Sequence, residues 1–231
     1  MREDQGVTPG TVVSMFTHAS RLNERTRTIR SFAAVGCPVA HVQMQYEAPK
    51  QSRNRRNALA SLSAAVRIAR DVNARAVLLI EDDVEPAVTL PEWLAFLEAT
   101  ESRAVTLYCP NFISARTHPA GLRRWAIGNG RAPASRVVTA RGLPQWWGSQ
   151  ALWFPLEVAD RVIADPRFER SDRSVGPWDI ALRAHWLARG DSLGMTVPNI
   201  VQHQPARNLI TPQKQVHRSL AFLATAPAPT V

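Results

Sequence analysis

The chain has 231 residues, 45% of them hydrophobic, and a formal net charge of +9 at pH 7, which is the size and composition of one α/β domain with a sizeable core. No apolar run reaches the ~18 residues that a membrane-spanning helix needs. Its two cysteines, Cys37 and Cys109, are too few for a disulfide framework. Because residues 1–10 are polar and lack the apolar region of a secretory signal, we expect a cytoplasmic protein.

The first part of the chain predicts alternating strands and helices. Residues 11–16 predict a strand, and an arginine-rich helix follows that ends near Gly36. Residues 39–46 predict a second strand. Residues 54–73 carry apolar side chains three and four positions apart, the spacing of an amphipathic helix. This order implies right-handed crossovers and a mostly parallel sheet.

The third predicted strand ends in adjacent carboxylates. Residues 77–80 form an apolar run that is too short for a typical helix, and Glu81, Asp82 and Asp83 follow at once. Side chains at this end of a parallel strand lie where ligands bind in open α/β sheets. Alternation predicts that Glu81 and Asp83 point to one side and Asp82 to the other. Converging carboxylates need a cation between them, and oxygen ligands suit Mg²⁺ or Mn²⁺; the alternative is a solvated acidic turn.

Further elements are predicted downstream. Residues 92–99 predict a short helix that Pro91 begins, and residues 104–109 a strand. Residues 148–155 lead into another helix that starts with a proline and runs to Ala164. No Gly-x-Gly-x-x-Gly follows the first strand and the chain has no P-loop, which argues against NAD, FAD and P-loop nucleotide sites.

These segments resemble parts of a known family. The acidic motif, residues 79–84, resembles the DxD-type signature of GT-A glycosyltransferases, especially the Glu-Asp-Asp variant of the lipooligosaccharide-type enzymes. Residues 148–155 resemble the family's segment along the donor sugar, residues 177–190 its helix that presents a carboxylate, and residues 197–203 its C-terminal strand ending in a metal-binding histidine. The resemblance covers roughly residues 11–210, although the chain is short for the family and leaves little room for a separate acceptor domain.

The resemblance implies a GT-A fold, which is a Rossmann-like α/β fold with a mostly parallel central sheet flanked by helices. We expect a flexible N-terminus over residues 1–10, a single GT-A-like domain over residues 11–222 and a flexible tail over residues 223–231. Within the domain, residues 11–100 would form the nucleotide-sugar-binding half and residues 101–222 the acceptor half.

The same resemblance implies a metal site and a nucleotide site. Asp83 would bind Mn²⁺ or Mg²⁺, with His203 as a second ligand, although a histidine in that place is often just hydrogen-bonded. Glu81 would lie near the ribose or the water on the metal. The residues expected to bind the nucleoside-diphosphate sugar are Thr17, Arg21, Glu81, Asp82 and Arg207.

Asp179 is the candidate general base. It stands at the start of a predicted helix, where an acidic residue can simply complement the helix dipole. In the functional alternative it takes a proton from the acceptor hydroxyl. If Asp179 is the base, the enzyme inverts the anomeric centre, and if it is not, the enzyme can be retaining; the sequence leaves both open.

Arginines and tryptophans gather in a segment without acidic residues, from Ser102 to Leu156. This segment contributes +7 of the net +9 and carries four tryptophans. Its arginines are Arg103, Arg116, Arg123, Arg124, Arg131, Arg136 and Arg141. Arginines bind phosphates and exposed aromatic rings stack on bases or sugars, whereas the plainer alternative is a solvated arginine face with tryptophans in the core.

These features predict a metal-dependent glycosyltransferase that moves a sugar from a nucleoside-diphosphate sugar to an acceptor hydroxyl. A nucleic-acid acceptor, such as a hydroxylated base in phage-like DNA, is slightly favoured over an envelope glycan or lipooligosaccharide at an anionic membrane. The residues expected to contact the acceptor are Arg123, Arg124, Trp146, Trp147 and Gln150. Two other classes remain open: a metal-dependent nuclease or phosphatase, and a catalytically silent GT-A-like binding module.

Overall fold

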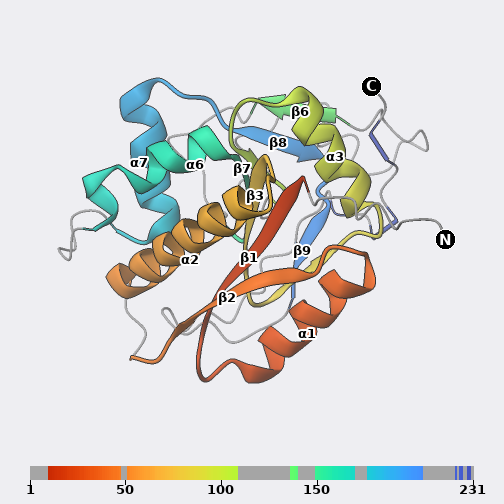
Figure 1. Cartoon of the computed structure of the whole chain (residues 1–231), viewed down its shortest axis with the longest axis horizontal. Helices are drawn as coiled ribbons and strands as arrows, with labels where there is room; N and C mark the ends of the chain where they lie inside the picture. The colour runs from red at the N-terminus through yellow and green to blue at the C-terminus, as the bar shows by residue number, and fades with distance from the viewer. Residues whose placement is uncertain are drawn as a thin grey trace.

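The computed structural model describes residues 10–47, 51–108, 136–139, 149–169 and 176–204, together with 222, 224–225 and 228–229. The elements, in chain order, are β1 (Thr11–His18), α1 (Leu22–Ala34), β2 (Val39–Gln45), α2 (Gln51–Asp71), β3 (Ala76–Glu81), β4 (Val84–Pro86), α3 (Leu90–Thr100), β5 (Val105–Thr106), β6 (Arg136–Thr139), β7 (Ala151–Pro155), α6 (Leu156–Ile163), the 3-10 turn η2 (Pro166–Phe168), α7 (Trp178–Arg189), β8 (Gly194–Val197) and β9 (Val201–His203). Figure 1 shows helices on both sides of a central sheet.

Within the described part of the chain, the central sheet has seven strands in the order β2-β1-β3-β7-β5-β8-β6. β1 is parallel to β2 and β3, and β5 is parallel to β8, whereas β7 is antiparallel to both its neighbours and β6 is antiparallel to β8. Therefore β1, β2, β3, β5 and β8 run one way and only β6 and β7 run the other. The prediction of an α/β fold with a mostly parallel sheet between helices is confirmed.

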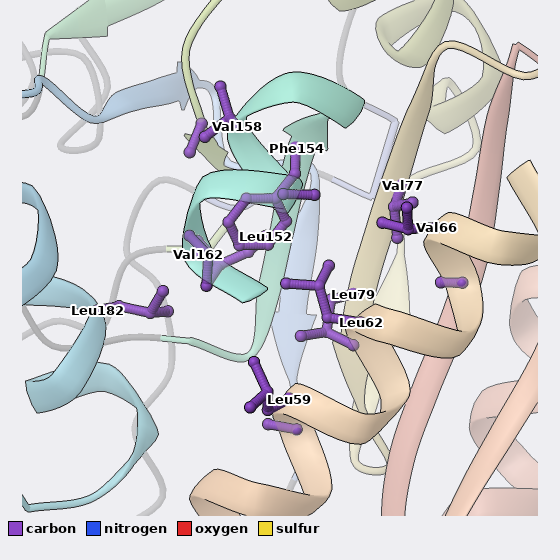
Figure 2. Close-up of a cluster of buried hydrophobic side chains, with 14 of the residues drawn as sticks. Leu59, Leu62, Val66, Val77, Leu79, Leu152, Phe154, Val158, Val162 and Leu182 are labelled. Atoms are coloured by element: carbon purple, nitrogen blue, oxygen red, sulfur yellow. The ribbon is translucent and has the colours of Figure 1, made fainter. Parts of the chain in front are cut away.

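The apolar run of β3 is buried on both faces, which explains why it lacks the alternation of a half-exposed strand. Val77 and Leu79 pack into one core with α2, α6 and α7, and Figure 2 shows part of this cluster. Leu78 and Ile80 pack into a second core with α1 and α3. Because successive side chains of a strand point to opposite faces, one short run serves both cores.

α2 is the amphipathic helix that the spacing predicts. Leu59, Leu62 and Val66 face the first core, as Figure 2 shows. The helix ends at Asp71, one residue short of the predicted apolar position Val72, which is 36% exposed. Asn73 then adopts a positive φ of 56°, a conformation that asparagine tolerates, and turns the chain into β3.

The segment expected as one strand over residues 197–203 forms two strands in different sheets. β8 belongs to the central sheet and ends at Val197, directly before Pro198, which has no N–H for the ladder. β9 instead pairs antiparallel with β4, in a small second sheet with Val84 opposite His203. The expected strand over residues 104–109 is also shorter, since only Val105 and Thr106 pair as β5.

Ala224, within the range expected to be flexible, accepts a backbone hydrogen bond from Val88 at 2.9 Å. None of the helices in the described part of the chain combines the length and apolar character needed to cross a membrane.

Candidate active site

A cluster of charged side chains lies where β1 and β3 end. The two strands are parallel, with Phe16 opposite Glu81, so the residues that follow them meet at one edge of the sheet. β3 ends at Glu81, residues 82–83 form a turn, and β4 begins at Val84. Because β4 pairs with β9, this turn also lies beside His203.

The buried carboxylate of Asp83 contacts side chains from two other parts of the chain. Its Oδ2 lies 3.2 Å from His203 Nε2 and accepts a hydrogen bond from Arg21 Nη2. Its Oδ1 is buried and has no hydrogen-bond partner among the described residues. His203 Nδ1 is buried without a partner there as well. The structure thus brings Asp83 and His203 together at this turn.

Asp82 does not point away from Asp83, so the prediction from strand alternation is wrong. Alternation holds only within an extended strand, and the chain turns after Glu81. Arg21 Nε lies 2.9 Å from Asp82 Oδ1, and Arg21 Nη2 lies 2.5 Å from Asp83 Oδ2. Asp82 also accepts a hydrogen bond from Thr17 Oγ1. Thr17 and Arg21, expected to meet the nucleotide, thus contact the carboxylates in this structure.

Glu81, the last residue of β3, lies beside the residues that lead into β7. Ser149 Oγ lies 3.2 Å from Glu81 Oε1, and the backbone N–H of Glu81 donates to the carbonyl of Gln150 at 2.9 Å. Since β7 is antiparallel to β3, its first residues fall at the acidic end of β3. Gln150, predicted to contact the acceptor, therefore lies at the edge of the carboxylate cluster, and its Oε1 is buried without a partner among the described residues.

The pKa values of the three carboxyls are shifted in different directions by burial and by neighbouring charges. Burial, and next the charge of Asp83, raise the pKa of Glu81 to about 8 and that of Asp82 to about 7. Burial also acts to raise the pKa of Asp83, but the hydrogen bond and charge of His203, together with Arg21, outweigh it and hold this pKa below its ordinary value. Of the three carboxyls, Asp83 is therefore the one whose ionised form the neighbouring groups favour most.

Helix α1 fixes the turn through contacts that the sequence did not reveal. Thr28 Oγ1 lies 2.9 Å from the backbone oxygens of both Asp82 and Val84. Arg27 Nη1 donates to Gln204 Oε1 at 3.0 Å, and the N–H of Gln204 donates to the carbonyl of Asp83 at 2.6 Å. A buried threonine within a helix has no sequence pattern that predicts such contacts with a turn. For Gln204, its position next to His203 is the one feature of the sequence that indicates a place near the site.

Asp179 lies at the start of α7, on the same edge of the sheet. Two residues early in α2 place it there: Arg55 contacts the carbonyl of Gly176, and Asn57 Nδ2 donates to the carbonyl of Thr17 at 3.1 Å. Burial raises the pKa of Asp179. Its Oδ1 accepts a hydrogen bond from the N–H of Ile180 at 2.9 Å, and within the described part of the chain no hydrogen bond or ion pair joins it to the acidic turn.

The other predicted site residues lie outside the described part of the chain. They are Arg123, Arg124, Trp146, Trp147 and Arg207. Of the tryptophans in the acid-free segment, Trp153 is described; it is 1% exposed and its Nε1 donates to Thr11 Oγ1 at 3.1 Å. For Trp153 the plainer alternative, a core tryptophan, is therefore correct.

No protein-family model matches the chain, and no curated protein sequence matches it significantly. It is similar to a solved Drosophila β-1,4-galactosyltransferase 7 in complex with manganese, UDP-Gal and xylobiose, with 12% identity and a TM-score of 0.46 over 85% of this chain and 72% of that one. It is also similar to the protein A197 from STIV, with 10% identity and a TM-score of 0.44 over 90% of this chain and 97% of that one. A third similar structure is a glycosyltransferase involved in the glycosylation of the major capsid of PBCV-1, with 9% identity and a TM-score of 0.41 over 76% of each chain. Likenesses at these identities and TM-scores carry no role over to this chain.

Proposed function

We propose that the protein is a metal-dependent glycosyltransferase of the GT-A type, which transfers a sugar from a nucleoside-diphosphate sugar to an acceptor hydroxyl. The observation that carries the proposal is the meeting of Asp83, from the turn after β3, and His203, from the distant strand β9, at the carboxyl edge of a mostly parallel sheet. The DxD-type motif around Asp83 supports it.

The residues at this edge fit a divalent cation. Asp83 Oδ2 and His203 Nε2 are 3.2 Å apart, close to the ~3 Å that separates neighbouring octahedral ligands at bond lengths of ~2.1 Å. The unpartnered Oδ1 of Asp83 is a further buried oxygen in reach of such an ion. The described residues contain no group of three or more acidic, histidine or cysteine side chains arranged for a metal. Two protein ligands are enough, because Mg²⁺ sites often combine one or two carboxylates with substrate phosphates.

A bound Mn²⁺ or Mg²⁺ would neutralise charge that builds up on the departing diphosphate. Asp83 and His203 would hold the ion, and Glu81 would contact its water or the ribose. Thr17 near the end of β1 and Arg21 just after that strand both contact Asp82 in the turn after β3, and all three would face the nucleotide. Arg207 would add a bidentate contact to the diphosphate. Asp179 would take the proton of the acceptor hydroxyl, a role to which its raised pKa is suited because a more basic carboxylate accepts a proton more readily.

For the acceptor we propose a nucleic acid carrying a hydroxylated base. The support is the composition of residues 102–156, which hold seven arginines and no acidic residue. Arg123 and Arg124 would contact phosphates, and Trp146, Trp147 and Gln150 the base or sugar. An envelope glycan on an anionic membrane is the competing acceptor. Salt-dependent DNA binding and retention on anionic vesicles separate the two.

The first test is slow hydrolysis of sugar nucleotides. We would incubate the protein with a panel of UDP- and GDP-sugars and Mn²⁺ and follow release of the nucleotide. We expect one donor to be hydrolysed, with loss of the signal when Mn²⁺ is chelated. A protein that leaves every donor intact but cleaves DNA with Mn²⁺ is instead a nuclease, and one that does neither yet binds a nucleotide is a silent binding module.

A further inference from the structure

Arg21 occupies the place between the carboxylates where a cation is expected. Its guanidinium reaches Asp82 through Nε at 2.9 Å and Asp83 through Nη2 at 2.5 Å. The side chain of Arg21 is only 11% exposed, and those of Asp82 and Asp83 are each 6% exposed. A positive charge that the chain itself supplies therefore already compensates the acidic turn.

One oxygen of Asp83 has two neighbouring nitrogen atoms from different side chains. Its Oδ2 is the acceptor for Arg21 Nη2 and also lies 3.2 Å from His203 Nε2. An ion that took this oxygen and this nitrogen as ligands would stand directly beside the guanidinium. Two positive charges at such a distance repel each other strongly where water is largely excluded.

We propose that Arg21 and a divalent cation compete for Asp83, an inference that rests on the cation site of the proposed function. Arg21 closes the turn when no ion is bound, and entry of the ion turns the guanidinium away from Asp83. The backbone of Arg21 need not move, because its N–H donates to the His18 carbonyl and its carbonyl accepts from the Arg25 N–H, both at 3.0 Å. The change is then a rotation of one side chain.

The displaced guanidinium has an anionic partner at hand in the proposed reaction. A guanidinium fork binds phosphate oxygens in pairs, and the diphosphate would lie against the same ion. A nucleotide would therefore draw Arg21 away from Asp83 and make room for the cation. By linkage, nucleotide and cation should each tighten the binding of the other, and Arg21 should contribute to that coupling.

The test measures Mn²⁺ binding without nucleotide, by the electron paramagnetic resonance signal of free Mn²⁺ and by calorimetry. Arg21→Met removes the competing charge and keeps an apolar stem of similar length. The matched control is Arg25→Met on the same helix, because the guanidinium of Arg25 contacts Met44 Sδ and the change removes the same net charge. We expect Arg21→Met to bind Mn²⁺ at least about tenfold more tightly than the parent protein, and Arg25→Met to bind like the parent.

Several outcomes are decisive. If Arg21→Met binds Mn²⁺ no more tightly than the parent, the competition does not exist. If the parent and the variant both bind no Mn²⁺, the proposed cation site fails and this inference fails with it. Should Arg21→Met fold only when Mn²⁺ is present, the ion replaces the lost guanidinium and the inference is supported. Should it not fold at all, Arg21→Gln decides: it also removes the positive charge but keeps N–H donors for the carboxylates, so tighter Mn²⁺ binding supports the competition and unchanged binding overturns it.

Discussion

Asp83 shows at the scale of one residue how charges from two other elements set the ionisation of a carboxylate. Arg21 from the start of α1 and His203 from β9 keep it ionised against the cost of burial. The two carboxyls beside it, Glu81 and Asp82, have raised pKa values, which burial and the negative charge of Asp83 cause. The sequence could predict that Asp83 lies at the end of β3, because the motif and the strand end are local. It could not predict Arg21 as its partner, since that contact depends on how α1 docks.

Asp83→Ala should abolish metal-dependent binding of the nucleotide without unfolding the protein. Arg21 keeps Asp82 as a partner in this variant, so we expect a loss of only about 1–3 kcal/mol in the free energy of unfolding. Calorimetry with UDP or GDP plus Mn²⁺ measures the affinity, and circular dichroism the fold. Asp160→Ala is the control, because Asp160 makes an exposed pair with Arg70. Unchanged nucleotide affinity in folded Asp83→Ala would remove the metal assignment.

Asp179→Asn should retain donor binding but lose transfer by ~10²-fold or more, as expected when proton transfer is removed. The base acts in its deprotonated form, so transfer by the parent enzyme should decline as the pH falls through the raised pKa of Asp179. That acidic limb should be missing from the residual rate of the variant. Transfer rates and pH profiles of the two proteins test this directly. Equal rates would reduce Asp179 to a residue that starts helix α7.

At the scale of elements, the order of strands and helices could be read from apolar spacing, whereas the small sheet could not. β4 and β9 are three residues long each and pair across more than a hundred positions, with Val84 opposite His203. Neither carries a periodic pattern long enough to predict a strand. The pairing nevertheless decides the site, because it brings His203 to Asp83.

A second long-range contact joins η2 to α7 and makes stability depend on pH. Asp165 Oδ2 lies 2.6 Å from His185 Nδ1 and 2.8 Å from Arg167 Nη2. Burial opposes ionisation, but the hydrogen bonds from Arg167 and His185 prevail and lower the pKa of Asp165 to about 2. Because the folded pKa lies below the unfolded value of ~3.9, the contribution of this carboxylate is complete above that value. It is lost as the pH falls toward about 2.

Asp165→Asn should therefore lower the free energy of unfolding by about 1.5–3 kcal/mol at pH ~7, the usual worth of hydrogen bonds to a charged group. The difference from the parent should shrink when the pH is lowered from ~4 toward ~2, because the parent then loses the same interaction. Urea unfolding of both proteins at several pH values measures it, with Asp160→Asn as a surface control. A difference that stays constant down to the lowest pH would mean that Asp165 acts through packing alone.

For the whole molecule, the α/β class with a mostly parallel sheet was predictable because β3 is one continuous apolar run and α2 is long and strongly amphipathic. The two reversed strands were not predictable, since β6 and β7 have the same apolar character as the parallel ones. Trp153 shows the limit for the site: composition placed it in a segment suggestive of binding, yet its ring fills the core. A tryptophan stacks or packs according to long-range contacts that composition does not report.

The charge of the whole chain leads to the prediction about the acceptor. Arg103 forms an ion pair with Glu101, with its Nε 2.9 Å from Oε2, so we count the other six arginines of residues 102–156. If they bind a nucleic acid, affinity for single-stranded or duplex DNA should fall steeply with salt, by a logarithmic slope of ~0.7 to 0.9 for each phosphate neutralised. Filter binding or fluorescence anisotropy over a range of salt concentrations measures that slope.

Replacing Arg123 and Arg124 together with alanine should reduce the slope by ~1.4 to 1.8 and leave donor hydrolysis intact, because these residues belong to the proposed acceptor half. Trp146→Ala should weaken binding of single strands by ~1–3 kcal/mol if its ring stacks on a base. Removing Arg70 and Arg189, both in exposed ion pairs elsewhere, subtracts the same charge and should change the slope far less. If the protein binds no DNA at low salt but is retained on anionic vesicles, the acceptor is an envelope glycan, and the site around Asp83 keeps its proposed role.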